Sequence, residues 1–112
     1  MKRSQSLKKN ADFQKIYKSG NSFVNKYLVM YVKENGLELN RIGISVSKKV
    51  GNSVVRHRLK RLIKESYRLH EDMFNSSLDV VIIARAAAKD KSYEEINKAV
   101  LHLGKLHRII GN

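Results

Sequence analysis

The chain has 112 residues, 23 of them lysine or arginine and only 10 aspartate or glutamate, so its formal net charge is +13. This length and a hydrophobic share of 42% fit one domain with one core. So large a positive charge favours a nucleic-acid partner over an anionic membrane surface or simple solubility. The absence of cysteine excludes disulfides and thiolate metal sites, and with no apolar run near ~18 residues we expect a cytoplasmic protein that does not enter a membrane.

The first third of the chain predicts an arm, a helix and a strand. Residues 1–9 are basic and polar, so we expect a flexible arm. Asn10 can cap a short helix that places Phe13 and Tyr17 on one face. The run FVNKYLVMYV, residues 23–32, is rich in β-branched and aromatic side chains and predicts one strand.

A turn signal and a strand with two unlike faces come next. Asn35-Gly36 is a strong hairpin signal. Residues 41–47 alternate between large apolar side chains on one face and small or polar side chains, such as Ser45, on the other. The second face is too polar to shelter a core, but a ligand could lie close against it.

The segment from Lys48 to Arg68 carries the clearest functional pattern. Eight of its 21 residues are lysine or arginine and only Glu65 is acidic. A helix capped by Asn52 or Ser53 would gather the positive side chains on one face and an apolar stripe on the opposite face. The basic face would consist of His57, Lys60, Arg61, Lys64 and Arg68, flanked by Arg56 and Arg58. The apolar stripe would consist of Val55, Leu59, Leu62, Ile63 and Leu69.

The remaining elements complete the fold class. Residues 78–84 form a continuous apolar run that suits a strand buried on both faces. Residues 92–95, SYEE, form a capping box that opens a last helix. The order helix, strand, strand, helix, strand, helix predicts an α+β domain over residues 1–112, with helices packed on one sheet.

The basic helix and the turn before it are candidate RNA contacts. The helix can neutralise phosphates, an attraction that weakens steeply with salt. A plain solvated face is the weaker interpretation, because Glu65 alone offers i,i+3 or i,i+4 pairing. Lys48, Lys49 and Asn52 stand at the start of the helix, where free backbone N–H groups favour an anion. An ordinary capped turn is the alternative for these three.

Aromatic residues provide a second candidate contact. If the first helix docks beside the polar face that carries Ser45, then Phe13, Tyr17 and Tyr31 would form a groove. Unpaired bases can stack in such a groove, each stack contributing about 1–3 kcal/mol with little dependence on sequence. On residues alone, ordinary core aromatics are the favoured interpretation.

No catalytic pattern accompanies these contacts. Protein nucleases gather carboxylates around metals or pair histidines. The ten acidic residues are scattered, and His70, His102 and His107 lack metal-ligand spacing. The sequence therefore predicts neither a catalytic residue nor a metal site on this chain.

The block SVSKKVGNSVVRHRLKRLIKE, residues 45–65, resembles the protein component of bacterial ribonuclease P, and the likeness extends through LKKNADFQKIYKSG (7–20) and DVVIIAR (79–85). It implies a two-layer α/β sandwich with a left-handed β-α-β crossover. It also implies that a large RNA subunit, using Mg²⁺, removes the 5′ leader of precursor tRNA. The protein would bind both RNAs, need no cofactor and no obligate protein partner, and hold the leader in the aromatic groove. The family's arginine-rich signature maps onto Arg56, His57, Arg58, Lys60, Arg61 and Lys64.

Three other functions fit parts of this pattern. A structural ribosomal RNA-binding protein would also use an excess of positive charge to bind phosphates, but it has no catalytic partner. A stand-alone nuclease would need the carboxylates that the sequence scatters. A helix-turn-helix regulator would need a second helix just before the basic one, where residues 41–47 predict a strand.

Overall fold

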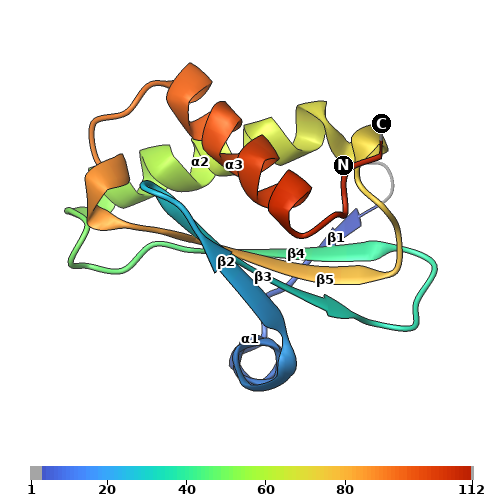
Figure 1. The fold of residues 1–112 in the computed structure, drawn as a ribbon. Coiled ribbons are helices and arrows are strands. Elements are labelled where there is room, and N and C mark those ends of the chain that lie inside the picture. The colour runs from blue at the N-terminus through green and yellow to red at the C-terminus, as the bar shows by residue number, and fades with distance from the viewer. Residues whose placement is uncertain (1–3, 112) are drawn as a thin grey trace.

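One mixed sheet with helices on both faces forms the scaffold of the computed structural model, which describes residues 4–111 (Figure 1). The strands are β1 (Ser4–Ser6), β2 (Asn21–Val24), β3 (Leu28–Glu34), β4 (Asn40–Ser45) and β5 (Leu78–Ala84), and the helices are α1 (Asn10–Ser19), α2 (Ser53–Leu69) and α3 (Tyr93–Leu106). Two short 3₁₀ helices lie at Glu71–Met73 and Ala86–Ala88. The strand order is β1-β4-β5-β3-β2.

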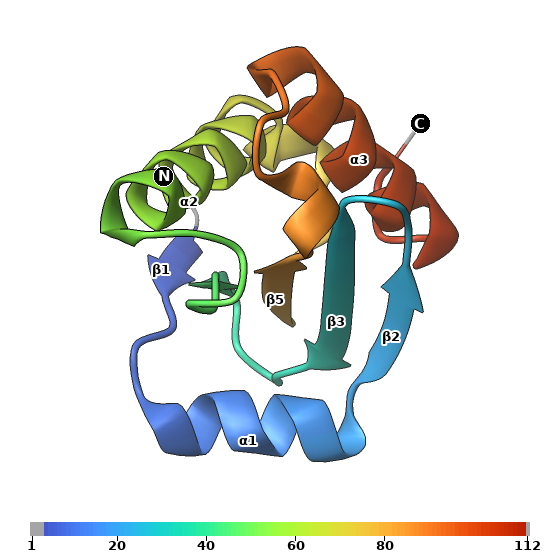
Figure 2. The same cartoon turned by 90° about the vertical axis from the view of Figure 1, so that its left-hand side faces the viewer.

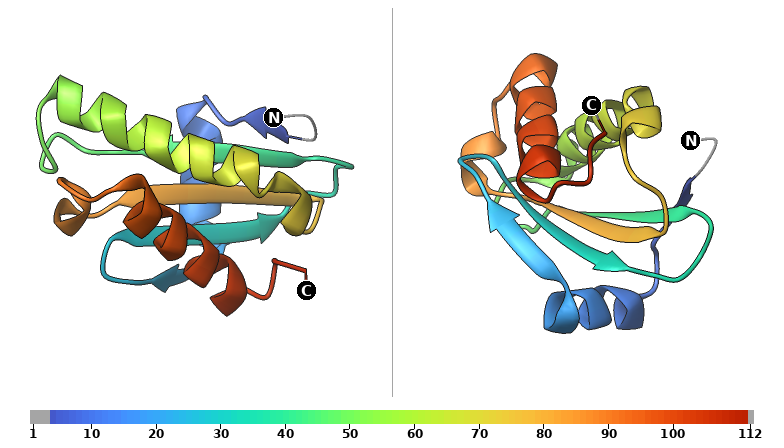
Figure 3. Two further views of the ribbon diagram at one scale, coloured as in Figure 1. Left: turned by 90° about the horizontal axis from the view of Figure 1, so that it is seen from above. Right: turned by 45° about the vertical axis from the view of Figure 1, so that its right-hand side comes forward.

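The layers follow from the alternation of apolar side chains along the strands. α2 and α3 lie over one face of the sheet, as the view from above shows, and α1 lies on the opposite face (Figure 3). In β5, Val80 and Ile82 join the core under α2 and α3, while Val81 joins a second core under α1. The predicted α+β sandwich with its order of long elements is confirmed, and α1 adds a partial layer on the far face.

α2 connects the parallel neighbours β4 and β5 and so makes the β-α-β crossover. Its left-handedness stays a prediction from the resemblance. β5, apolar except for Asp79, takes the central place in the sheet because it can be buried on both faces.

The prediction of a loose arm over residues 1–9 is wrong for the part of it that the structure describes. Ser4–Ser6 pairs in parallel with β4, and Leu7 is buried. The hydroxyl groups of Ser4 and Tyr67 form a hydrogen bond of 2.7 Å that ties β1 to α2. The exposed edge of β4 gives this segment backbone partners that no local sequence signal reveals. Residues 1–3 lie outside the described residues.

The prediction of a single strand over residues 23–32 is also wrong, because Asn25 folds this run into a hairpin. Its side-chain oxygen accepts hydrogen bonds from the backbone nitrogens of Tyr27 (3.2 Å) and Leu28 (2.9 Å). Asparagine makes such turns by bonding its own backbone two or three residues on. The high β-propensity on both sides conceals the turn.

Asn35-Gly36 is a turn, with Gly36 at φ 70°, but it does not join paired strands. β5 lies between β3 and β4, so the turn crosses the end of β5. The backbone nitrogen of Asn35 donates instead to the carbonyl of Ser77, just before β5 (2.9 Å). The local signal predicted the reversal of the chain, whereas burial of β5 decided the pairing.

The apolar stripe of α2 is confirmed at its centre and wrong at its end. Leu59 and Ile63 are fully buried, but Leu69 is 55% exposed. Ser66 and Tyr67 occupy the last buried turn instead. The Tyr67 hydroxyl accepts a hydrogen bond from Asn40 (3.2 Å), which gives this polar group a partner inside the core.

Candidate nucleic-acid interface

The face of the sheet under α1 is divided into three rows of side chains that point the same way. Paired residues of neighbouring strands share a face. Across β4, β5 and β3, the rows are Arg41–Asp79–Lys33, Gly43–Val81–Tyr31 and Ser45–Ile83–Val29. α1 crosses this face of the sheet (Figure 2) and packs on the middle row. A charged row is left on one side of it and a more open row on the other.

Gly43 allows α1 to lie directly on β4. A Cβ atom at this position would stand 2.6 Å from the ring of Phe13, closer than atoms can approach. The rings of Tyr17 and Tyr31 meet edge to face, with centroids 5.1 Å apart. The expected docking of the first helix beside the polar strand face is therefore what the structure has.

A groove of about 270 Å³ runs beside α1 over the open row, and we call it the aromatic groove. Phe13, Tyr17 and Ser45 come together in it as predicted, while Tyr31 stands behind Tyr17 and supports that ring. Burial raises the pKa of Tyr17 and a hydrogen bond with Ser45 opposes that rise, so the phenol stays neutral at physiological pH. Its full lining is Lys8, Asn10, Phe13, Tyr17, Ile44, Ser45, Val46 and Lys60.

The positive side chains of α2 form the predicted exposed face. Asn52 caps the helix, its side chain accepting from the nitrogen of Val55 (3.0 Å). A second groove of about 390 Å³, the basic groove, lies between this face and the β1–β4 edge. The exposed basic-face residues are His57, Lys60, Arg61, Lys64 and Arg68. The basic groove is lined by Ser6, Leu7, Ile42, Ile44, His57, Lys60, Arg61 and Lys64.

The two grooves share Lys60 and Ile44, so they form one connected surface. Cations and stackable rings are thereby placed side by side, although they come from segments more than 40 residues apart. This arrangement fits a nucleic-acid strand whose phosphates meet the lysines while its bases meet the rings.

The basic residues flanking this face are not equivalent. Arg56 donates to the carbonyl of Gly51 (3.3 Å), which stiffens the start of α2. Arg58 points toward α3 and donates to the carbonyl of Lys91 (2.8 Å). Arg68 forms an ion pair with Glu65. These arginines therefore have less freedom to meet RNA than Lys60, Arg61 and Lys64.

Lys48 and Lys49 lie exposed in the turn before α2. Buried Val46 and Val50 hold both ends of that turn against the core. The turn is thus a fixed projection of positive charge beside the capped start of the helix, as the sequence predicted.

The N-terminal segment contributes groove residues that the sequence alone did not predict. Ser6 and Leu7 line the basic groove, and Lys8 and Asn10 line the aromatic groove. The prediction that Asn10 caps α1 is wrong, because the cap position is Lys9, which makes no side-chain cap bond. The sequence signal here is the pair Lys8-Lys9 beside the start of α1, and this pair does not show where the N-terminal segment docks.

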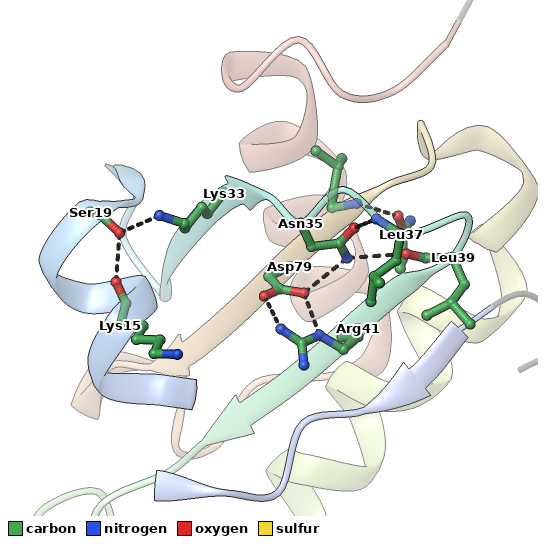
Figure 4. Close-up of polar contacts among 10 residues, drawn as sticks. Lys15, Ser19, Lys33, Asn35, Leu37, Leu39, Arg41 and Asp79 are labelled. Carbon is green, nitrogen blue, oxygen red and sulfur yellow. Dashed lines mark hydrogen bonds and ion pairs between the residues drawn. The ribbon is translucent and has the colours of Figure 1, made fainter. Parts of the chain in front are cut away.

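The charged row anchors the other side of α1, as the close-up shows (Figure 4). Arg41 donates to both carboxylate oxygens of Asp79, at 2.8 and 2.6 Å, and Asn35 donates to one of them at 3.0 Å. Lys33 donates to the hydroxyl of Ser19 at the end of α1 (2.7 Å). The first set of bonds joins β4 to β5, and the bond from Lys33 joins β3 to the end of α1.

We expect Asp79→Asn to destabilise the protein, because Arg41 would lose its ionic partner. The Arg41–Asp79 ion pair is neither fully exposed nor fully buried. The loss in free energy of unfolding should therefore fall between roughly 0.2–1 kcal/mol for an exposed pair and about 3–5 kcal/mol for a buried one. Burial favours a higher pKa for Asp79, but hydrogen bonds from Arg41 and Asn35 outweigh it and lower that pKa.

Because the folded pKa of Asp79 is lowered, its stabilising contribution is complete above the unfolded pKa of about 3.9 and is lost as pH falls through the folded value. Urea unfolding of the wild type and of Asp79→Asn between pH 7 and 3 measures this difference. The difference in free energy of unfolding between the wild type and Asp79→Asn should become smaller in acid. Asp90→Asn, a control at an exposed turn position, should unfold as the wild type does. A difference that is constant with pH would contradict the assignment.

Neither a membrane span nor a metal cluster occurs in the described part of the chain. No helix within residues 4–111 is both long and apolar enough to cross a bilayer. Over the same residues, histidine, aspartate and glutamate side chains nowhere gather in threes in a way that could hold a metal ion.

The fold and this connected surface define a class: a small basic α+β domain whose exposed cations lie beside aromatic rings. The profile of the family described as Ribonuclease P matches residues 1–107. The ribonuclease P protein component of Lachnoclostridium phytofermentans is 62% identical over 109 residues, which cover 97% of this chain and 94% of that protein. That of Clostridioides difficile is 48% identical over 104 residues, covering 92% and 91%.

Solved structures agree with these relatives. The RNase P protein of Staphylococcus aureus superposes with a TM-score of 0.88 at 40% identity, covering 95% of this chain and 97% of that one. That of Thermotoga maritima gives 0.84 at 31% identity, covering 96% and 99%. The chain therefore belongs to the ribonuclease P family, as a protein component of that tRNA-processing ribonuclease.

Proposed function

We propose that the protein binds the RNA subunit of ribonuclease P through the basic groove and holds the 5′ leader of precursor tRNA in the aromatic groove. The observation that carries the proposal is the sharing of Lys60 and Ile44 by the two grooves. A strand leaving an RNA active centre beside α2 would pass straight onto the rings of α1. The turn at Lys48 and Lys49 would extend the phosphate contacts.

The chemistry of the aromatic groove suits a leader of variable sequence. Stacking on Phe13 and Tyr17 accepts any base, because every base has a π face. Lys8 and Lys60 at the same groove would attract the backbone phosphates. Precursor tRNA should therefore bind more tightly than mature tRNA, which lacks the leader.

The proposal leaves phosphodiester cleavage to the RNA subunit and its Mg²⁺ ions. Three of the ten carboxylates have structural roles: Asp79 pairs with Arg41, Glu65 pairs with Arg68, and Glu95 belongs to the capping box of α3. The protein's part would be to screen phosphates near the active centre, which lets Mg²⁺ bind productively at physiological concentration. No cofactor and no further protein would be needed, and the work would take place in the cytoplasm.

Reconstitution at low Mg²⁺ tests this function against its alternatives. Purified protein is added to ribonuclease P RNA and precursor tRNA at a Mg²⁺ concentration where the RNA alone is inactive. We expect cleavage at the mature 5′ end to be restored. A structural ribosomal RNA-binding protein would restore nothing, and a stand-alone nuclease would cut the precursor without the RNA. Either result would reject the proposal.

A further inference from the structure

A separate hollow lies between the β2–β3 turn and α3. α3 and α1 lie on opposite faces of the sheet (Figure 2). The volume of the hollow is about 280 Å³, and we call it the hairpin pocket. Side chains of the turn form one wall and side chains of α3 form the other. The turn contributes Asn25, Lys26 and Tyr27, and α3 contributes Glu95, Lys98 and His102.

Asn25 makes this pocket rigid. Besides folding the turn, its side-chain amide donates to the carbonyl of Ala99 (3.0 Å) and lies 3.2 Å from Nδ1 of His102. Arg85 donates to the carbonyl of Asn25 (2.6 Å) and fixes the turn from the β5 side. The walls are therefore in place before any ligand arrives.

Positive charge surrounds the one aromatic ring of the pocket. The ammonium groups of Lys26 and Lys91 stand 5.7 and 5.5 Å from the centre of the Tyr27 ring. Lys98 lines the opposite wall. Among the described lining residues the single carboxylate is Glu95, which accepts bonds from Ser92 in the capping box and from the hydroxyl of Tyr27 (3.4 Å). Both ammonium groups lie over the ring, so a base can stack there by displacing one of them, and the displaced amine can pair with the phosphate.

We propose that the hairpin pocket binds one unpaired nucleotide of structured RNA, with its base on Tyr27 and its phosphate between Lys26 and Lys98. This inference depends on the proposed RNA partners, but it concerns a different surface from either groove. The bond from Arg58 of α2 to the carbonyl of Lys91 connects the pocket to the flank of the basic helix. Because the pocket borders the flank of the basic helix, the nucleotide is assigned to the RNA subunit, which we propose binds the basic groove.

The test measures how tightly full-length variants bind ribonuclease P RNA and, in the assembled holoenzyme, mature tRNA, each at several salt concentrations. Tyr27→Ala should weaken binding of ribonuclease P RNA about 5- to 150-fold without changing the salt slope, because stacking is uncharged. Tyr27→Phe keeps the ring and should bind almost as the wild type. Lys98→Ala should lower the salt slope by about 0.7–0.9, the value for one phosphate that is no longer neutralised. A loss of affinity for mature tRNA alone would reject the RNA subunit as the source of the nucleotide.

Tyr27→Leu and Arg61→Ala serve as controls. Leucine keeps apolar bulk at the half-buried position of Tyr27, so Tyr27→Leu should stay folded. If Tyr27→Leu loses as much RNA affinity as Tyr27→Ala, the loss comes from the removal of stacking and not from unfolding. If Tyr27→Ala and Tyr27→Leu bind both RNAs as the wild type does while Arg61→Ala binds RNA weakly, the pocket proposal is overturned and the proposed function stands. If Arg61→Ala also has no effect, the proposed function itself fails.

Discussion

Arg61→Ala is expected to weaken the complex with ribonuclease P RNA and to flatten its dependence on salt. Arg61 is exposed, lines the basic groove and projects from a helix that is capped and buried along its other face. Each phosphate that the protein no longer neutralises should reduce the slope of log affinity against log salt by about 0.7–0.9. Lys60→Ala should show the same change and should also weaken leader binding, because Lys60 lines both grooves.

Two matched variants make this experiment specific. Arg68→Ala removes a positive charge from the same helix, but Arg68 is already paired with Glu65, so its effect should be smaller. Lys105→Ala removes an exposed charge from the last turn of α3, outside both grooves. Binding titrations at several salt concentrations give affinity and slope together. Equal slopes for Arg61→Ala, Lys105→Ala and the wild type would reject the assignment of the basic groove.

Tyr17→Ala is expected to reduce affinity for precursor tRNA about 5- to 150-fold while leaving affinity for mature tRNA unchanged. The ring lines the aromatic groove, and removing one base stack costs about 1–3 kcal/mol. Phe13→Ala should act in the same direction. Tyr31 is a poorer choice, because its ring supports Tyr17 from behind and its removal would loosen α1 as well.

Tyr17→Phe is the matched control for the groove. It keeps the ring and removes only the hydroxyl that bonds Ser45, so most of the leader affinity should remain. Phe13 and Tyr17 also pack against the second core, so thermal unfolding of each variant must be measured in parallel. Comparable reductions for precursor and mature tRNA would show that the groove does not hold the leader.

Local sequence patterns predicted the elements that depend on interactions between residues a few positions apart. The basic face of α2 is exposed as its 3.6-residue period indicated, because the helix places side chains by its own geometry. The capping box at Ser92 is present because all its bonds fall within four residues. The apolar run of β5 is buried on both faces, as the composition of the strand itself indicated.

Tertiary contacts decided which of these elements became neighbours. Asn35-Gly36 reversed the chain without pairing β3 with β4, and the N-terminal segment found an edge strand that its own sequence does not reveal. The sequence pattern placed Arg58 and Arg68 among the RNA contacts, yet each has a partner within the protein.

By itself the sequence determined the α+β class, the row of cations on one helix and the aromatic residues on another. Only the tertiary structure decided that the two surfaces meet at Lys60. The reason is physical: helix periodicity and caps depend on residues a few positions apart. Strand order and the docking of α1 on Gly43 depend instead on burying apolar surface among segments far apart in the chain.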